Sequence, residues 1–158
     1  MFSIFKKTPI DRFDTVEGEN KGKYRFLSNF YPAPLVWRGE KYDTSEHAYQ
    51  AEKFIMRDPE YAEEIRNAKT AGKAKRLGQR PRPLDEDNKW WDDMKYKRME
   101  NIVRAKFKQN WKLRWKLRMT GKRELIEGNT WGDTYWGVCD DVGENHLGKI
   151  LMKIREEL

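Results

Sequence analysis

The chain has 158 residues, of which 37% are charged, and a formal net charge of +7. This length suits one domain with a substantial core, for which seven Trp, seven Tyr and seven Phe supply apolar material. No apolar run reaches membrane-spanning length, the amino terminus lacks a secretory apolar region, and the single cysteine, Cys139, excludes an internal disulfide. These features exclude a membrane-spanning or disulfide-stapled protein, and we expect a cytoplasmic one.

The beginning of the chain is predicted to be irregular. Residues 1–20 show no clear periodicity and are expected to form a strand or an irregular N-terminal arm. An aromatic loop follows at Leu27–Tyr31. The alternating pattern of residues 35–42 around Arg38-Gly39 then predicts a hairpin.

Two helices are predicted after this hairpin. Asp43 is a good helix N-cap with Glu46 three residues later, which is the spacing of a capping box, so the first helix is expected to run from there to about Arg57. Asp58-Pro59 then starts a second helix, because Pro suits the first helical position.

The rest of the chain is predicted to be mainly helical. The expected elements are a short helix at 69–80 ended by Gly78, a long helix at about 87–108, a helix at 110–119, short strands at 124–127 and 135–139, and a closing helix at 146–157. The apolar stripe of the long helix is Met99, Ile102, Val103 and Phe107. We therefore predict an α+β fold, a single helix-rich domain over residues 1–158 with short strands.

Positive charge is concentrated in residues 89–123, which hold thirteen Lys or Arg against three Asp or Glu, an excess of ten. Four tryptophans lie in the same stretch: Trp90, Trp91, Trp111 and Trp115. Basic residues interleaved with aromatic ones can bind nucleic acid through phosphate contacts and base stacking. A solvated basic face on a helix pair is the commoner explanation of such a run, and a pyrophosphate-bearing ligand would also be attracted by it.

One helix face combines an acid, an amide and an amine. Glu46, Gln50 and Lys53 follow one another at i, i+4 and i+7, so they project from the same side of a helix. The simplest explanation is that Glu46 closes a capping box on an ordinary solvated face. The neighbouring loop Leu27–Tyr31 favours a ligand pocket instead, where the helix dipole would keep Glu46 charged, as a base or an electrostatic stabiliser.

Three further residues have two or more open interpretations each. Trp91 lies at the edge of the apolar stripe of its helix, so it is either a core residue or an indole that stacks on a base. Asp133 is either a turn aspartate bonded to its own backbone or a carboxylate presented by a tight loop. Lys75 is a surface lysine, a phosphate contact or a nucleophile. His47 and His146 lack metal-ligand spacing, and we expect no metal site.

Six blocks in order resemble the NADAR family, also called YbiA-like. They are Leu27–Phe30, Thr44–Phe54, Ala74–Gly78, Trp91–Lys95 with Met99, Asp133–Gly137 and Asn145–Met152, and together they span about residues 24–155. The resemblance implies a YbiA-like fold and an N-glycosidase that needs no cofactor. Implied substrates are the ribosylamino-pyrimidine and pyrimidinedione phosphates of riboflavin biosynthesis, or ADP-ribose attached to guanine bases.

The resemblance also assigns expected roles to residues. Its functional positions match Glu46, Trp91 and Asp133. We expect Glu46 and Asp133 to be catalytic, with Lys53 before Lys75 as a candidate for imine formation with the ribose. Substrate-binding residues are expected to be Asn29, Phe30, Gln50, Trp91 and Trp136.

Two other classes of function remain open. A non-catalytic module that binds NAD or ADP-ribose would bind its ligand without turnover. A nucleic-acid-binding protein that uses the basic stretch 89–123 would show strongly salt-dependent affinity. The two combine in an enzyme that acts on ADP-ribosylated nucleic acid, since such an enzyme needs a basic surface.

Overall fold

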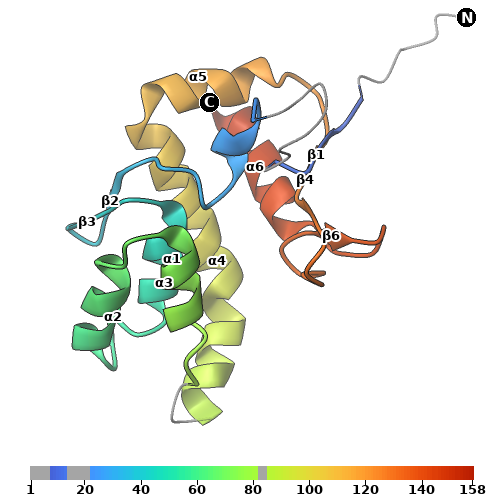
Figure 1. Ribbon diagram of the computed structural model, residues 1–158. Coiled ribbons are helices and arrows are strands. Elements are labelled where there is room, and N and C mark those ends of the chain that lie inside the picture. Colours follow the sequence, from blue (N-terminus) through green and yellow to red (C-terminus); the bar gives the residue numbers. More distant parts are fainter. Residues whose placement is uncertain (1–7, 14–21, 82–84) are drawn as a thin grey trace, which may run out of the picture. The chain divides into compact units, whose positions relative to one another are not determined.

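A computed structural model describes residues 8–13, 22–81 and 85–158 (Figure 1). The chain forms two compact units. Asn29–Asn110 is the helical unit, and Met1–Ser28 with Trp111–Leu158 is the terminal unit. The single domain expected over residues 1–158 stays a prediction. Most of the N-terminal arm expected at 1–20 lies outside the described residues.

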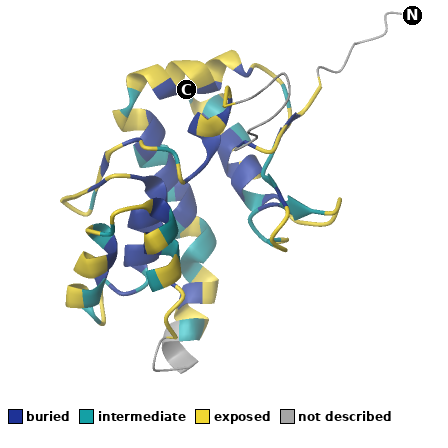
Figure 2. Cartoon of the chain, in the orientation of Figure 1, coloured by how far each residue is buried: buried dark blue, intermediate teal, exposed yellow. Residues whose placement is uncertain are grey.

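The helical unit is built around α1. Its elements are β2 (Leu35–Trp37), β3 (Glu40–Tyr42), α1 (Ser45–Glu52), α2 (Pro59–Arg66), α3 (Ala71–Leu77) and α4 (Asp85–Gln109). Helix α1 packs against α2, α3 and α4. All eight of its residues are buried, although most of them are polar (Figure 2). Burying polar side chains is costly unless they find partners, so the groups that surround α1 determine what its side chains can do.

The predicted hairpin is confirmed. Strands β2 and β3 pair antiparallel, with Leu35 opposite Tyr42 and Trp37 opposite Glu40. Arg38 and Gly39 both have positive φ, 51° and 85°, as a two-residue type I′ turn requires.

Most predicted helices of this unit are confirmed. Asp58 caps α2 through its side chain, with Pro59 in the first turn. Helix α3 ends at the predicted Gly78. The predicted apolar stripe of α4 is buried at all four positions: Met99, Ile102, Val103 and Phe107.

A buried carboxylate links the hairpin to the helices. Glu52, the last residue of α1, accepts hydrogen bonds from Trp37 Nε1 at 2.8 Å and from Arg38 Nε and Nη2 at 2.9 and 2.8 Å. Arg98 of α4 forms an ion pair with the same carboxylate at 3.2 Å. Because removing one partner of a buried ion pair costs several kcal/mol, this network fixes α1 against its neighbours.

The terminal unit combines both ends of the chain. Its elements are β1 (Ile10–Asp11), a short 3₁₀ helix (Arg25–Leu27), α5 (Trp111–Met119), β4 (Leu125–Ile126), β5 (Gly128–Asn129), β6 (Val138–Cys139) and α6 (His146–Glu157). Strand β1 pairs with β4, and β5 with β6, both in parallel. Helices α5 and α6 and the strands β4 and β6 were predicted, whereas the 3₁₀ helix and β5 were not.

None of the helices that the structure describes is long and apolar enough to cross a bilayer.

Candidate active site

Helix α1 begins one residue later than the sequence predicted. Thr44, not Asp43, is the N-cap, and its Oγ1 accepts the backbone N–H of His47 at 3.2 Å. Glu46 is therefore the second residue of the helix and not the third, so it does not close the predicted capping box. Its carboxylate is available for another partner.

The helix also ends earlier than predicted, at Glu52 and not near Arg57. The backbone N–H of Phe54 bonds to the carbonyl of Ala51 at 2.9 Å, which tightens the last turn before Asp58-Pro59 starts the next helix. Lys53 is consequently the C-cap residue and not an interior helical residue.

The carboxylate of Glu46 is paired inside the helical unit. Gln50 Nε2 donates a 2.7 Å hydrogen bond to Glu46 Oε1, which joins the two residues across one helical turn as their spacing predicted. Both are buried, with 6% and 5% of their surfaces exposed. An acid and an amide paired in the interior are not a solvated helix face.

Two lysines lie close to this pair. Lys53 Nζ donates to the carbonyl of Gly78 at 3.2 Å, which bridges α1 to the end of α3. The positive charges of Lys75 and Lys53 both favour the ionised form of Glu46, and that of Lys75 has the larger effect. We call Glu46, Gln50, Lys53 and Lys75 the Glu46 cluster.

Burial raises the pKa of the Glu46 carboxyl above its ordinary value. The hydrogen bond from Gln50 and the two lysine charges lower this pKa, but they do not offset the loss of solvation. The sequence led us to expect that the helix dipole would keep Glu46 charged. The structure contradicts this expectation, because burial raises the pKa of the Glu46 carboxyl, and Glu46 is better suited to donate a proton than predicted.

The raised pKa predicts a pH-dependent stability difference. The Glu46 carboxyl keeps its proton to a higher pH in the folded protein than in the unfolded chain. This proton binding stabilises the folded state fully below the ordinary pKa of a Glu carboxyl, and the stabilisation is lost as pH rises through the raised pKa of the folded state. Glu46→Gln removes this titration. Its melting temperature relative to the wild type should therefore rise between pH 4.5 and pH 8. A difference that stays constant or falls over this range, in thermal unfolding, would show that the folded pKa is not raised.

Gln50 is packed tightly against the end of α3. A Cβ added at Gly78 would lie 2.0 Å from Gln50 Oε1 and 2.8 Å from its Cβ, so only glycine permits this approach. Gln50 Oε1 is buried and has no hydrogen-bond partner. Such an atom usually needs an explanation, and a donor on a bound ligand would satisfy it.

Aromatic rings border the cluster. Trp91 is 4% exposed, so it is more deeply buried than its place at the edge of the stripe suggested. Its ring lies 5.1 Å from that of Tyr49, and Lys53 Nζ lies 5.8 Å from the Trp91 ring centre. Phe30, in contrast, is 38% exposed, and Lys75 Nζ lies 5.7 Å from its ring centre. Phe30 therefore offers an accessible ring beside the cluster.

Asn29 positions the loop before α1. Its Oδ1 accepts from Ser45 Oγ at 3.0 Å, its Nδ2 donates to Met99 Sδ at 3.2 Å, and its carbonyl accepts the backbone N–H of Glu46 at 3.1 Å. These contacts anchor the start of α1, and the contact with ligand expected of Asn29 stays a prediction.

Asp133 and Trp136 lie in the terminal unit. Asp133 Oδ1 accepts the backbone N–H groups of Tyr135 and Trp136 at 3.1 and 2.9 Å, which is the turn geometry that was one of its two interpretations. Asn129 holds the loop, since its Oδ1 accepts from Asp133 N at 3.1 Å and its Nδ2 donates to Asp133 O at 2.7 Å. The catalytic role of Asp133 stays a prediction.

The NADAR domain pattern matches residues 16–158. The chain belongs to the NADAR family. Its fold is similar to the NMR structure of the Escherichia coli protein YbiA, with a TM-score of 0.78 and 35% identity, covering 98% of this chain and 86% of that one. The predicted family and the predicted α+β, YbiA-like fold are thereby confirmed.

Relatives of this NADAR protein carry enzyme names. It is 40% identical to N-glycosidase YbiA of Escherichia coli (strain K12), over 85% of this chain and 82% of the relative. It is 37% identical to N-glycosidase Npun_R5314 of Nostoc punctiforme, over 85% and 86%. It is 40% identical to riboflavin biosynthesis protein VVA0006 of Vibrio vulnificus, over 89% of this chain but 36% of that longer protein. These names agree with the expected N-glycosidase, a hydrolase.

Two features beside the predicted positions were missed. Beside the Glu46 cluster, the Tyr49 ring lies 5.1 Å from that of Trp91, and Lys53 Nζ is 5.5 Å from the Tyr49 ring centre. The position of Tyr49 three residues after Glu46 was the available signal. In the terminal unit of this NADAR protein, His146 bonds to Glu144 Oε2 and its ring lies 4.4 Å from that of Tyr135. No metal-like or catalytic spacing marked that pair.

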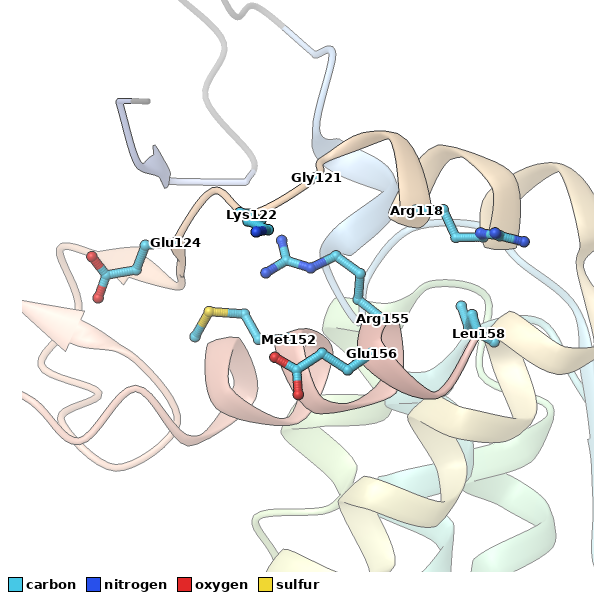
Figure 3. Close-up of a pocket in the computed structure, with 8 residues that line it drawn as sticks. All are labelled: Arg118, Gly121, Lys122, Glu124, Met152, Arg155, Glu156 and Leu158. Carbon is cyan, nitrogen blue, oxygen red and sulfur yellow. The ribbon is translucent and has the colours of Figure 1, made fainter. Parts of the chain in front are cut away.

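A cavity of about 820 Å³ in the terminal unit has none of the residues predicted for the site (Figure 3). Its lining mixes charges of both signs: Arg118, Gly121, Lys122, Glu124, Met152, Arg155, Glu156 and Leu158. Arg155 donates to Thr120 Oγ1 at 2.9 Å and to the carbonyl of Arg123 at 2.8 Å. We give the Glu46 cluster priority over this cavity, because chemistry depends on the groups present and not on volume.

Proposed function

We propose that this NADAR protein is an N-glycosidase that uses the Glu46 cluster to hydrolyse the bond between ribose C1′ and a base nitrogen. The observation that carries the proposal is a buried carboxylate with a raised pKa, bonded to Gln50 and flanked by Lys53 and Lys75. Strongly perturbed ionisable groups cluster at functional sites. Relatives that are named N-glycosidases and align with most of the chain support the same reaction.

The chemistry requires one proton transfer in each direction. As the C1′–N bond breaks, its electron pair goes to the base nitrogen, and Glu46 supplies the proton that the departing base needs. Positive charge develops on the ribose and is stabilised by the carboxylate that this transfer creates. Water then adds its oxygen to C1′ and returns a proton to Glu46.

Other predicted residues have supporting roles in this proposal. Gln50 would donate to Glu46 and accept a bond from the substrate through its unpartnered Oε1. The exposed ring of Phe30 would contact the base, while Trp91 would border the site from within the fold. Asp133 and Trp136 stay candidates for substrate contact.

For the substrate class, we favour a ribosylamino-pyrimidine or pyrimidinedione phosphate of riboflavin biosynthesis. The names of two relatives support it, from Vibrio vulnificus and Zea mays, although both are much longer proteins of which the chain covers 36% and 23%. ADP-ribose attached to guanine is the alternative substrate, and it presents the same ribose-to-base bond.

A paired product assay tests the function. Purified protein is offered a ribosylamino-pyrimidine phosphate and ADP-ribosylated guanosine separately, and free base and free sugar phosphate are measured by chromatography with mass detection. We expect stoichiometric base and ribose 5-phosphate from the first substrate. Release of base from ADP-ribosylated guanosine alone would show that ADP-ribosylated guanine is the substrate class. Binding of either compound without release of base would support a non-catalytic nucleotide-binding module.

A lysine of the cluster supplies a second route for the same hydrolysis. The lysine amine would attack C1′ and expel the base, whose nitrogen takes a proton from Glu46. Opening of the ribose ring then gives the imine, and water hydrolyses it to restore the lysine and free the sugar aldehyde. The sequence placed Lys53 first. We now favour Lys75, because its charge acts more strongly on Glu46, the carboxylate that would take its proton.

Borohydride present during turnover should trap this imine as a stable adduct on Lys75, located by peptide mass mapping. Lys75→Arg keeps the positive charge but removes the nucleophilic amine, so it should abolish the adduct and slow base release. Lys53→Arg is the matched variant and should still give the adduct. If no adduct forms during turnover and both variants keep wild-type rates, water attacks C1′ directly.

A further inference from the structure

Helix α5 carries an exposed aromatic and basic face that the proposed reaction does not use. Only Leu113 and Leu117 among its nine residues are buried. Trp111, Trp115 and Met119 are 66%, 60% and 65% exposed. Most of α5 is coloured as exposed in Figure 2. Large apolar side chains gathered on one exposed helix face usually mark an interaction site.

The spacing of these side chains makes the face a regular platform. Trp111, Trp115 and Met119 are four residues apart, so they form one ridge with about 6 Å between neighbours along the helix axis. By helical projection, Arg114 and Arg118 lie on one side of the ridge. Lys112 and Lys116 lie on the other, and all four cations are exposed.

The positive charge of this face has no acidic residue nearby in the sequence to neutralise it. No acidic residue occurs between Glu100 and Glu124. The part of the basic stretch that lies in α4 differs, because Lys95 pairs with Asp92 at 3.0 Å and Arg104 with Glu100 at 2.8 Å. The predicted basic surface at 89–123 is therefore concentrated on α5.

We propose that the outer face of α5 binds single-stranded nucleic acid, with two bases stacked on Trp111 and Trp115 and the phosphates held by the flanking cations. Aromatic platforms beside a basic track are the way in which proteins bind single strands without sequence preference. The proposal goes beyond the N-glycosidase activity and does not depend on it.

Two other anionic partners fit the face less well. A duplex offers phosphates but keeps its bases stacked on one another, so the two indoles would gain nothing from it. An anionic membrane needs a broad apolar face that can be inserted, whereas the exposed apolar side chains of α5 form one narrow ridge with cations on both sides.

Fluorescence anisotropy of a labelled twelve-nucleotide single strand tests the proposal on the full chain. The double variant Trp111→Ala with Trp115→Ala should weaken binding by about fivefold or more for each base that can no longer stack on an indole. Trp131→Ala is the matched control, since Trp131 is 61% exposed in the same unit but lies outside α5, and it should bind as the wild type does. All variants should melt at the wild-type temperature, because the replaced side chains are exposed.

Salt dependence separates phosphate contact from stacking. Each neutralised phosphate of a single strand contributes about −0.7 to the slope of log affinity against log salt, so Arg114→Gln with Arg118→Gln should reduce the slope by about 1.4. Lys149→Gln, an exposed lysine on α6, should leave it unchanged.

Three results would overturn the proposal. One is binding of the single strand that the double tryptophan variant does not weaken. The second is equal or tighter binding of a duplex of the same sequence. The third is binding to vesicles of phosphatidylcholine and phosphatidylserine without binding to the single strand at low salt. None of these depends on base release, so they are distinguishable from a failure of the proposed function.

Discussion

Glu46→Gln is expected to lower the rate of base release by at least about a thousandfold, since it removes both a general acid and the carboxylate that stabilises the ribose cation. Gln has the size of Glu and can still accept the hydrogen bond from Gln50. The variant should therefore fold and bind substrate normally. Initial rates of base release at saturating substrate, with far-ultraviolet circular dichroism as a check of folding, give the comparison.

Glu60→Gln is the matched control for this substitution. Glu60 is exposed in the first turn of α2, in the same unit, and lies outside the Glu46 cluster. We expect this variant to keep the wild-type rate. A folded Glu46→Gln protein with wild-type activity would remove Glu46 from the mechanism and leave the acid–base chemistry to other groups.

Gly78→Ala is expected to damage the site from a distance. The new Cβ would lie 2.0 Å from Gln50 Oε1, and turning the amide away would not suffice, because the Cβ of Gln50 is itself 2.8 Å away. Helix α3 must then separate from α1, which carries Lys75 away from Glu46. Overpacking of this kind costs about 1–3 kcal/mol of stability, and a shift of about 1 Å in a catalytic group can cost about a hundredfold in rate.

Gly72→Ala, in the same helix, separates this effect from helix propensity. A Cβ at Gly72 would meet Arg76 Nη1 at 3.8 Å and Thr70 Oγ1 at 3.9 Å, which are ordinary contacts. This variant should be as stable as the wild type or more so, since Ala favours a helix over Gly by about 1 kcal/mol. Thermal unfolding and initial rates measure both variants. Equal behaviour of the two would mean that the contact between Gly78 and Gln50 does not position the cluster.

Local signals in the sequence were sufficient for most elements of the fold. The Arg38-Gly39 turn, the Asp58-Pro59 helix start and the stripe of α4 are each decided by residues close together in the chain, and each was predicted. The start of α1 was misplaced by one residue because Asp43 and Thr44 are both good caps. Only the φ of −144° at Thr44 and its bond to His47 distinguish them.

The residues of the site could be predicted from the sequence, but their burial and their contacts with distant segments could not. Helical spacing identified the pair of Glu46 and Gln50, and the structure joins them at 2.7 Å. Spacing cannot show that three helices bury this pair, and burial is what reverses the expected direction of the Glu46 pKa. The close approach of Gly78 to Gln50 joins segments far apart in the chain, so no local pattern indicated it.

The most direct measurement of the central claim is a crystal structure of Glu46→Gln with a ribosylamino-pyrimidine phosphate bound. The slow variant should preserve the substrate, so the bond that is normally cleaved becomes visible. We predict that the nitrogen at C1′ lies within hydrogen-bond distance, about 2.6–3.2 Å, of the side chain at position 46. Substrate bound away from the Glu46 cluster, for example in the cavity lined by Arg118 and Arg155, would contradict the account.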